Sequence, residues 1–293
     1  MYQRLTQRTK CEEDLVQYSK PHTYNQSRRT TAAARTNDRT MPSNPQIDAP
    51  QTLAGLFPPD SDEEEEEGEP DPCYEVQSMV LADYKLQIRQ FAYHSHNANR
   101  VWPGTFNLAD YLLAKTSDAQ GAFQHEWGRV LELGTATGLL AIRLALASTQ
   151  HSDATSVCCT SIVTSDVVDD DALVHENLKF NYELNGVLHP PPHVPHTWGT
   201  GFDASVAAAG IQDFQKPFDT IVASDILLYV SAYGALVETL KELMAREGPQ
   251  TRFIMSWNRR MKESAEFFTR MEQAGFECRH EGKCIYTFER VLD

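Results

Sequence analysis

The stretch that most constrains the fold of this chain is RVLELGTATGLLAI, residues 129–142. An apolar run, Val130 to Leu133, ends at a turn between Gly134 and Gly138 and leads directly into the helix-forming LLAIRLALA. A strand, a turn and a helix in this order typically cradle a nucleotide cofactor, because glycines let the backbone approach the ligand and the helix N-terminus carries partial positive charge. The alternative is an ordinary strand-to-helix turn without a ligand.

The spacing of the glycines indicates which cofactor binds. A dinucleotide fingerprint requires G-x-G-x-x-G, whereas Gly134 and Gly138 lie four residues apart, with Thr135 and Ala136 following the first. With Glu132 two residues earlier, the pattern E-x-G-x-x-x-G resembles motif I of the seven-strand methyltransferases, which implies that this turn binds S-adenosyl-L-methionine. Ala136 replaces the middle glycine of that family, and its methyl group narrows the approach to the methionine end of the cofactor.

The charge of the chain is unevenly spread. Residues 1–40 carry eight Lys/Arg and four Asp/Glu, residues 41–72 carry ten acids and no base, and the formal net charge of the whole chain is −15. An acidic body gives no support to an enzyme that holds nucleic acid through phosphate contacts, so a nucleic-acid partner is not expected. It attracts a basic protein more readily.

Cysteine and histidine usage indicates neither a disulfide framework nor a metal site. The six cysteines form no C-x-x-C pair, and reduced thiols in an intracellular protein fit best. His189, His193 and His196 fall in a proline-rich stretch without a carboxylate set, so we expect a surface loop and no metal. Because no run approaches 18 apolar residues and no secretory h-region is present, we expect a cytoplasmic protein, with the nucleus as an alternative.

Composition divides the chain into two parts. Residues 1–72, basic and then acidic with SDEEEEEGEPDP near the end, cannot bury enough apolar surface to offset the entropy of ordering, so we expect a disordered tail. Its acidic run is interpreted as a solvated spacer, with an interaction tail as the alternative. Residues 73–293 form the predicted folded domain.

Periodicity within residues 73–293 predicts an α/β fold. A β-hairpin over 75–92 precedes strands and helices that alternate, which describes a mostly parallel, doubly wound sheet closed by a C-terminal antiparallel hairpin. The expected elements are a helix that follows the Pro103-Gly104 break and ends near Lys115, a helix to about Ala147, strand SIVTSD, a helix before Gly186, a short strand ending at Trp198, a strand over Phe218 to Ala223, a helix over Ala232 to Arg246, strand TRFIMSW, helix KESAEFFTRMEQAG, and two strands around Glu281-Gly282.

Five stretches together carry a more specific resemblance: VWPGTFNLADYL, VLELGTATGLLAI, HTWG, VASDILLY, and FIMSW followed by ESAEFF. The region from Tyr74 to Phe288 resembles the family-16 methyltransferases, which are rich in protein lysine methyltransferases and use S-adenosyl-L-methionine. The resemblance implies that the following residues line the cofactor: Trp102, the Gly134 to Ala136 turn, Asp166, Trp198 and Ser224. Asp166 also ends the predicted second strand, where an acid can bind both ribose hydroxyls. Without the resemblance, Trp102 and Trp198 are equally compatible with positions in the hydrophobic core.

The same resemblance implies the catalytic residues. Relatives carry Asp-x-x-Tyr or Asp-x-x-Phe after strand four, whereas here Asp225 precedes Tyr229 by four residues, one more than in that pattern. We expect Asp225 to orient an acceptor amine and Tyr229 to shelter it, in a monomer that methylates lysine of another protein. The alternatives are a cofactor-binding module with weak catalysis, and a methyltransferase acting on a small molecule or on a different protein side chain.

Overall fold

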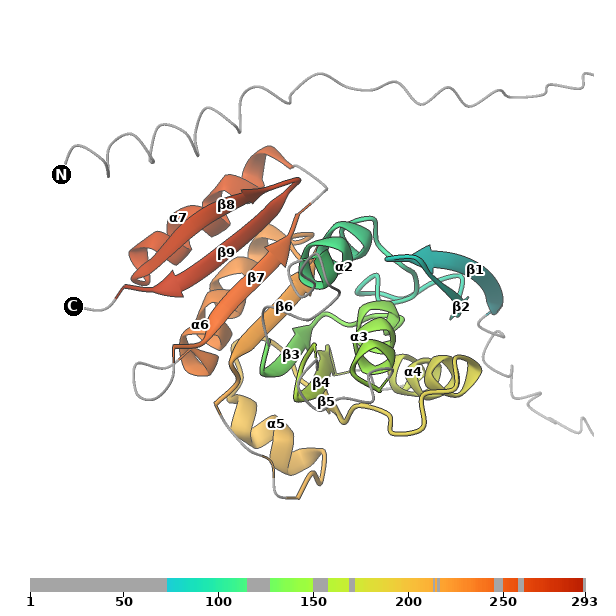
Figure 1. Cartoon of the computed structure of the whole chain (residues 1–293). Coiled ribbons are helices and arrows are strands. Elements are labelled where there is room, and N and C mark those ends of the chain that lie inside the picture. The colour runs from blue at the N-terminus through green and yellow to red at the C-terminus, as the bar shows by residue number, and fades with distance from the viewer. Residues whose placement is uncertain are drawn as a thin grey trace, which may run out of the picture. The chain divides into compact units, whose positions relative to one another are not determined.

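A computed structural model describes residues 73–114, 127–149, 158–168, 172–212, 214, 217–244, 250–257 and 261–291 (Figure 1). The predicted disordered tail over 1–72 lies outside the described residues. No helix in these ranges is long and apolar enough to cross a membrane.

The centre of the domain is a mixed sheet of seven strands in the order β5-β4-β3-β6-β7-β9-β8 (Figure 1). Five strands run parallel, and β9 pairs antiparallel with both β7 and β8, which confirms the predicted C-terminal hairpin. The strands are β3 Arg129–Leu133, β4 Ser161–Asp166, β5 His193–Pro195, β6 Thr220–Ser224, β7 Arg252–Ser256, β8 Phe276–Gly282 and β9 Ile285–Arg290.

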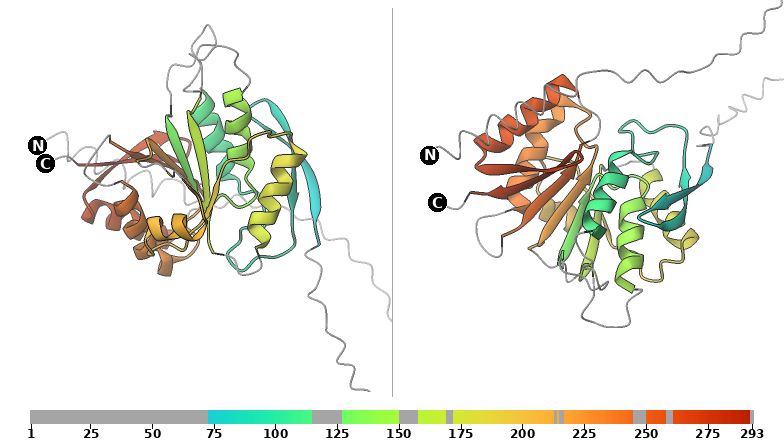
Figure 2. Two further views of the ribbon diagram at one scale, coloured as in Figure 1. Left: turned by 90° about the horizontal axis from the view of Figure 1, so that it is seen from below. Right: turned by 45° about the horizontal axis from the view of Figure 1, so that its top comes forward.

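Helices cover both faces of this sheet, so the predicted doubly wound α/β fold is confirmed (Figure 2). One face carries α2, α3 and α4, and the other carries α5, α6 and α7. Their bounds are α2 Gly104–Ala114, α3 Leu139–Thr149, α4 Leu173–Leu184, α5 Phe202–Ala208, α6 Tyr233–Leu243 and α7 Ala265–Gln273, with 3-10 turns at Val230–Ala232 and Lys262–Ser264. Helix α5 was not predicted.

The predicted N-terminal hairpin is formed by β1 Glu75–Leu81 and β2 Tyr84–Gln90, and it is attached to α4 by a row of asparagines. Asn181 accepts the Arg89 backbone N–H at 2.7 Å and donates to the Arg89 carbonyl at 3.1 Å. One turn later, Asn185 bonds the Gln87 backbone N–H and carbonyl in the same way. Helix α4 thus takes the place of a third strand, since its side chains satisfy backbone groups on the outer edge of β2.

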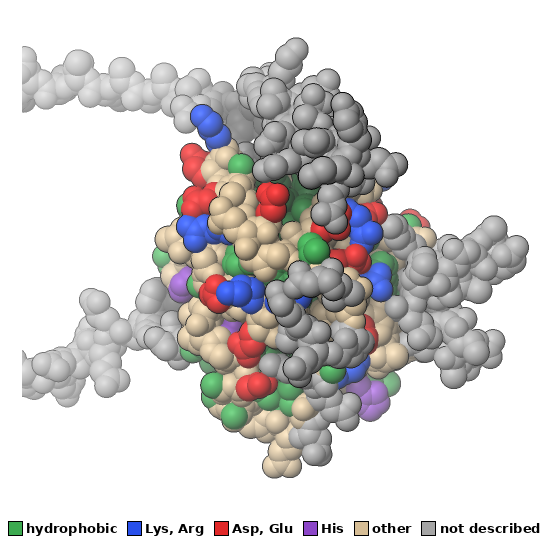
Figure 3. Space-filling view, turned by 90° about the vertical axis from the view of Figure 1, so that its left-hand side faces the viewer, with side chains coloured by type: hydrophobic (Ala, Val, Ile, Leu, Met, Phe, Trp, Pro, Cys, Tyr) green, Lys and Arg blue, Asp and Glu red, His purple; other side chains and the backbone are tan. Residues whose placement is uncertain are grey.

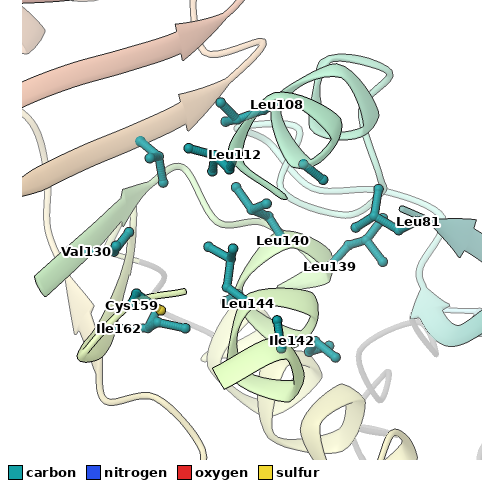
Figure 4. Packing of buried hydrophobic residues seen from close by; sticks show 14 of the residues in the cluster. Leu81, Leu108, Leu112, Val130, Leu139, Leu140, Ile142, Leu144, Cys159 and Ile162 are labelled. Atoms are coloured by element: carbon teal, nitrogen blue, oxygen red, sulfur yellow. The ribbon is translucent and has the colours of Figure 1, made fainter. Parts of the chain in front are cut away.

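The main apolar core joins the hairpin to the central strands (Figure 4). Leu81 of the hairpin lies beside Leu139 of α3, and Cys159 lies beside Ile162 of β4. Cys158 and Cys159 are 0% and 2% exposed, although most of their sequence neighbours are polar. Both thiols instead act as small apolar side chains that precede β4.

Two other boundaries differ from the predictions. The third parallel strand ends at Pro195, so Trp198 follows it within a loop. The terminal hairpin turns at Lys283 and Cys284, which both have positive φ, whereas the turn was expected at Glu281-Gly282. Two consecutive left-handed residues match the type I′ turn, whose twist suits a two-residue hairpin.

Candidate active site

The carboxyl ends of the parallel strands meet where the chain order of the sheet reverses. From β3, the chain continues to β4 on one side, whereas β6 lies on the other side. A doubly wound sheet opens a crevice at such a switch point, and ligands bind there. Register aligns Leu133 with Ser165 and with Ala223, so the segments that follow these three strands emerge side by side.

A cavity of about 230 Å³ lies at this switch point. Eight of the eleven predicted site residues line it: Trp102, Gly134, Ala136, Asp166, Trp198, Ser224, Asp225 and Tyr229. Glu132 and Thr135 line a small adjoining hollow that also includes Trp102 and Ser224. Gly138 lines neither and faces α4, where a Cβ on it would lie 2.6 Å from Leu178 Cδ2.

The turn after β3 has the conformation that its glycines require. Gly134 and Gly138 have φ of +66° and +79°, in the left-handed region that glycine adopts without steric cost. A Cβ on Gly134 would meet Ile226 Cγ2 at 2.8 Å, so this position also needs a close backbone approach. Ala136 adopts the same region, with φ of +47°, although it carries a side chain. The alanine at the middle position of the motif is therefore strained.

The Asp166 carboxylate holds this turn. Its Oδ2 accepts the Ala136 backbone N–H at 2.7 Å, and its Oδ1 accepts the Val167 N–H at 2.8 Å. Burial raises the pKa of Asp166, and the two backbone hydrogen bonds oppose that rise. Because each carboxylate oxygen accepts two hydrogen bonds, each retains a site for one hydroxyl of a bound ribose.

Glu132, in β3 just before the turn, is a second buried carboxyl group. Burial raises its pKa to about 8, with a hydrogen bond from Thr135 opposing the rise and the nearby Asp166 charge adding to it. Thr135 Oγ1 donates to Glu132 Oε2 at 2.7 Å, within the same turn. Glu132 is therefore chiefly the neutral acid at pH 7 and supports the conformation of the turn rather than adding a charge.

Asp225 follows β6 and is 3% exposed. Its Oδ2 accepts the backbone N–H of Gly104, the first residue of α2, at 2.6 Å. A Cβ on Gly104 would lie 2.7 Å from that oxygen, so the glycine of VWPG permits the contact. The carboxylate therefore satisfies one of the unpaired N–H groups at the start of a helix while it lines the cavity.

Tyr229 lies at the edge of the cavity and is 41% exposed. Its hydroxyl accepts a hydrogen bond from Asn97 Nδ2 and donates to the Ser95 carbonyl at 3.3 Å. The Trp102 indole Nε1 donates to the Asn97 carbonyl at 3.1 Å. Tyr229 and Trp102, both predicted site residues, are thus hydrogen-bonded to the segment between β2 and α2.

His196 anchors the loop that carries Trp198 to the helices next to it, and its side chain is 1% exposed. The His196 ring bonds Ser205 Oγ of α5 at 2.9 Å and Thr239 Oγ1 of α6 at 3.2 Å. Its backbone N–H donates to the Asp166 carbonyl at 2.7 Å. The expectation that this histidine belongs to a surface loop is wrong, because the unpredicted α5 covers it.

Several cavity residues were not predicted from the sequence. They are His96, Asn97, Ala98, Val167, His196, Thr197, Ile226, Leu228, Ala232 and Ala235. The polar run HSHNANR stands immediately before VWPG, and that position was the available signal for the first three. No group of three His, Cys, Asp or Glu residues within the described ranges could hold a metal ion.

The fold and the site together define a class of protein. A sheet of this order, with a glycine turn after the central strand β3 and an acid at the end of β4, is that of an S-adenosylmethionine-dependent methyltransferase. The profile of the lysine methyltransferase family matches residues 80–274, and the chain belongs to this family. No curated protein matches the chain.

Three of the solved structures with a similar fold are methyltransferases. The 16S rRNA N2 G1207 methyltransferase RsmC of T. thermophilus, in complex with AdoMet and guanosine, is 15% identical, with a TM-score of 0.46 over 75% of this chain and 51% of that chain. The N-methyltransferase NodS of Bradyrhizobium japonicum, in complex with S-adenosyl-l-homocysteine, is 12% identical, with a TM-score of 0.42 over 64% and 88%. A methyltransferase from Pyrococcus furiosus is 16% identical, with a TM-score of 0.41 over 66% and 88%. The chain spans about half the length of the first of these.

The described residues fit the cofactor of this class. Asp166 and Trp198, which we expect from the sequence to line the cofactor, both line the cavity. Among the described residues, the acidic side chains that line the cavity are Asp166 and Asp225 and no Lys or Arg lines it, which suits a cationic sulfonium. When bound, S-adenosylmethionine supplies the methyl group.

Proposed function

We propose that the protein transfers a methyl group to the side-chain amine of a lysine in another intracellular protein. The observation that carries this proposal is the pairing of a buried carboxylate, Asp225, with an exposed aromatic ring, Tyr229, at the edge of the cofactor cavity. A carboxylate and an aromatic face are the groups that attract an amine which becomes cationic during transfer.

The charge distribution supports a basic protein as substrate. The chain has a net charge of −15, so a lysine-rich partner is attracted at long range. On the face drawn in Figure 3, acidic and basic side chains are interspersed and do not form a basic stripe. RNA or DNA would require such a stripe for phosphate contacts, so the described side chains of this face do not offer a nucleic-acid surface.

The chemistry requires the acceptor to lose its proton before it attacks. A free lysine has a reference pKa of about 10.4, so neutrality at pH 7 costs about 4 to 5 kcal/mol. Withdrawal of the amine from water, against the Tyr229 ring and the apolar Leu228 and Ile226 of the cavity wall, reduces that cost. Tight enclosure also excludes water and aligns the amine for in-line displacement.

The two predicted catalytic residues then have distinct roles. Asp225 lines the cavity and orients the amine by hydrogen bonding, and it need not act as a strong base. Tyr229 acts through the face of its ring, because its hydroxyl proton is donated to the Ser95 carbonyl. The ring face shelters the methylammonium as its positive charge develops.

The compartment and the assembly state are part of the proposal. The six cysteines form no C-x-x-C pair and we expect them to be reduced thiols, which supports a reducing compartment such as the cytoplasm. We expect a monomer, which light scattering on the purified full chain would test.

The deciding experiment incubates the full-length protein with radiolabelled S-adenosylmethionine and a proteome extract divided into protease-treated, nuclease-treated and dialysed portions. Label that disappears after protease treatment, survives the other two and maps by mass spectrometry to lysine supports the proposal. Label in nucleic acid, in a dialysable molecule or on another side chain would assign a different acceptor. Excess S-adenosylhomocysteine, which should abolish all labelling, is the control.

One rival is a cofactor-binding module with weak catalysis. The strained Ala136 in the cofactor turn is the observation in its favour. In that case calorimetry would show S-adenosylhomocysteine binding while no portion of the extract became labelled.

A further inference from the structure

The segment between β2 and α2 forms one wall of the active-site cavity through His96, Asn97 and Ala98. Hydrogen bonds to His94 organise it as a tight turn. The His94 carbonyl accepts the Asn97 N–H at 3.0 Å, and its ring Nδ1 accepts the N–H groups of His96 at 3.2 Å and Ala98 at 3.4 Å. The wall therefore has a defined shape of its own.

Asn97 is the point at which this wall meets both aromatic residues. Its side-chain Nδ2 donates to the Tyr229 hydroxyl, and its backbone carbonyl accepts from Trp102 Nε1 at 3.1 Å. The two aromatic residues are far apart in sequence, and both line the cavity. One residue thus ties together two side chains that we expect to contact the ligands.

The backbone of Asn97 explains why an asparagine suits this position. Its φ is +61°, in the left-handed region that only glycine, asparagine and aspartate visit readily. Glycine would adopt the same backbone but would lack the amide that reaches Tyr229. Asparagine satisfies both requirements.

Tyr229 depends on this contact for its place. Its side chain is 41% exposed, so burial does not fix the ring. The described hydrogen bonds of its hydroxyl, with Asn97 Nδ2 and the Ser95 carbonyl, both go to the same segment. Loss of the Asn97 amide therefore leaves the longer bond to the Ser95 carbonyl to hold a ring that must lie against the acceptor.

We propose that Asn97 is a positioning residue that holds Tyr229 beside Trp102, and that it thereby sets the alignment of the acceptor amine without itself touching the reacting atoms. The inference rests on the proposed function, because it assigns to Asn97 the geometry of the methyl acceptor. It adds a residue outside the predicted site to the machinery for substrate alignment.

The test is a double-mutant cycle in the full chain with Asn97→Gly and Tyr229→Phe. Asn97→Gly keeps the left-handed backbone and removes only the amide, so kcat for methyl transfer should fall by about ten- to a hundred-fold through misalignment. The dissociation constant of S-adenosylhomocysteine should stay within about three-fold, since the cofactor turn is untouched. The double variant should transfer no more slowly than the worse single variant, because both changes remove the same contact.

Asp83→Gly is the matched control, since Asp83 has a φ of +64° in the hairpin turn and lies outside the cavity. Asn97→Asp, whose carboxylate can accept from the Tyr229 hydroxyl, should recover part of the rate. Wild-type kcat in Asn97→Gly, additive effects in the cycle, or an equal loss in Asp83→Gly would overturn the inference. If Asn97→Gly does not fold, Tyr229→Phe removes the same hydrogen bond from the other side and must show the kcat loss.

The inference and the proposed function fail in different ways. If the wild-type protein methylates an acceptor other than lysine, the proposed function is wrong and the cycle is measured on that acceptor. If it labels nothing, the NMR signals of the Tyr229 ring decide instead, because the amide removed in Asn97→Gly bonds the Tyr229 hydroxyl. Ring signals in Asn97→Gly identical to those of the wild type would then show that the Asn97 amide does not hold Tyr229.

Discussion

The Asp225 carboxylate accepts the backbone N–H of Gly104 at 2.6 Å and so joins the end of β6 to the first residue of α2. The two residues are 121 positions apart in the chain. Asp225 is buried, and its φ of +49° lies in the left-handed region, so a strained backbone conformation sets the direction of its side chain. A residue predicted to contact the acceptor therefore also stabilises the fold.

These two roles of Asp225 are separable by substitution. Asp225→Asn keeps an oxygen for Gly104 and tolerates the left-handed backbone, but it loses the charge, so we expect a small change in unfolding free energy and a fall in methyl transfer of about ten- to a hundred-fold. Asp225→Ala leaves a buried N–H unpaired and should also lose about 1 to 3 kcal/mol of stability. Urea unfolding measures the stability, and transfer kinetics measure the rate. Calorimetry with S-adenosylhomocysteine measures the cofactor affinity, which should stay within a few-fold in both variants.

Asp219→Asn is the matched control, because Asp219 Oδ2 accepts the Arg129 backbone N–H at 2.7 Å and lies away from the cavity. It should leave transfer unchanged. Full activity in Asp225→Asn would restrict Asp225 to its structural role.

The second prediction concerns the strained alanine of the cofactor turn. Ala136→Gly removes a left-handed strain of roughly 1 to 2 kcal/mol and adds the entropy of a glycine in the unfolded chain, so stability should rise by up to about 1 kcal/mol. The dissociation constant of S-adenosylhomocysteine should fall, because the methyl group no longer narrows the approach. Thermal unfolding and calorimetry measure the two effects.

Ala172→Gly provides the comparison for Ala136. Ala172 precedes α4 with a φ of +54° and does not line the cavity. It should give a similar gain in stability with unchanged affinity. Equal affinity changes in both variants would remove any specific role of the alanine at position 136 in cofactor binding.

Local patterns predicted the parts of the fold that depend on neighbours in sequence. The alternation that places Leu86 and Ile88 inward predicted β2, and the glycine spacing predicted the turn after β3. Helix α5 escaped prediction because its seven residues present too short an apolar pattern. The burial of Cys159 also escaped, since a core position beside α3 depends on tertiary packing and not on its polar neighbours in the chain.

In the candidate site, too, some residues could be located from local sequence patterns and others depend on tertiary contacts. Motif residues such as Asp166 could be located because the carboxyl ends of parallel strands share one edge of the sheet. The contacts of Asp225 with Gly104 and of Tyr229 with Asn97 join segments more than 100 residues apart. No local pattern encodes such pairs, so only the three-dimensional structure brings the segment between β2 and α2 to the cavity.

The third prediction connects the hairpin to the cofactor turn through Asn181. Besides its two bonds to Arg89, Asn181 Nδ2 donates to the Thr137 carbonyl at 2.9 Å. Asn181→Ala should cost about 2 to 4 kcal/mol of stability, because it leaves buried backbone groups unpaired. It should also weaken S-adenosylhomocysteine binding, because the turn between Gly134 and Gly138 loses a support.

Asn185→Ala removes an equivalent pair of bonds, to the Gln87 N–H and carbonyl, at the exposed end of the same row. It should cost less stability and leave cofactor affinity unchanged. Unaltered affinity in a folded Asn181→Ala protein would contradict the link between the hairpin and the turn.

The last prediction follows from Glu132, whose pKa is raised from 4.5 to about 8, first by burial and then by the charge of Asp166. Between these two values the unfolded chain has lost this proton while the folded chain keeps it, so the contribution of Glu132 to stability is full below about pH 4.5 and falls as the pH rises towards 8. Glu132→Gln removes the titration and keeps an oxygen for Thr135 Oγ1. The stability of the wild type relative to this variant should decline by up to about 1.4 kcal/mol per pH unit across that window and then stay level. Urea unfolding of both proteins at several pH values measures the difference, and Glu277→Gln, which removes an exposed carboxyl of β8, controls for the loss of net charge. A difference that stays constant from pH 4.5 to 8 would show that Glu132 is ionised in the folded protein and carries a charge beneath the cofactor turn.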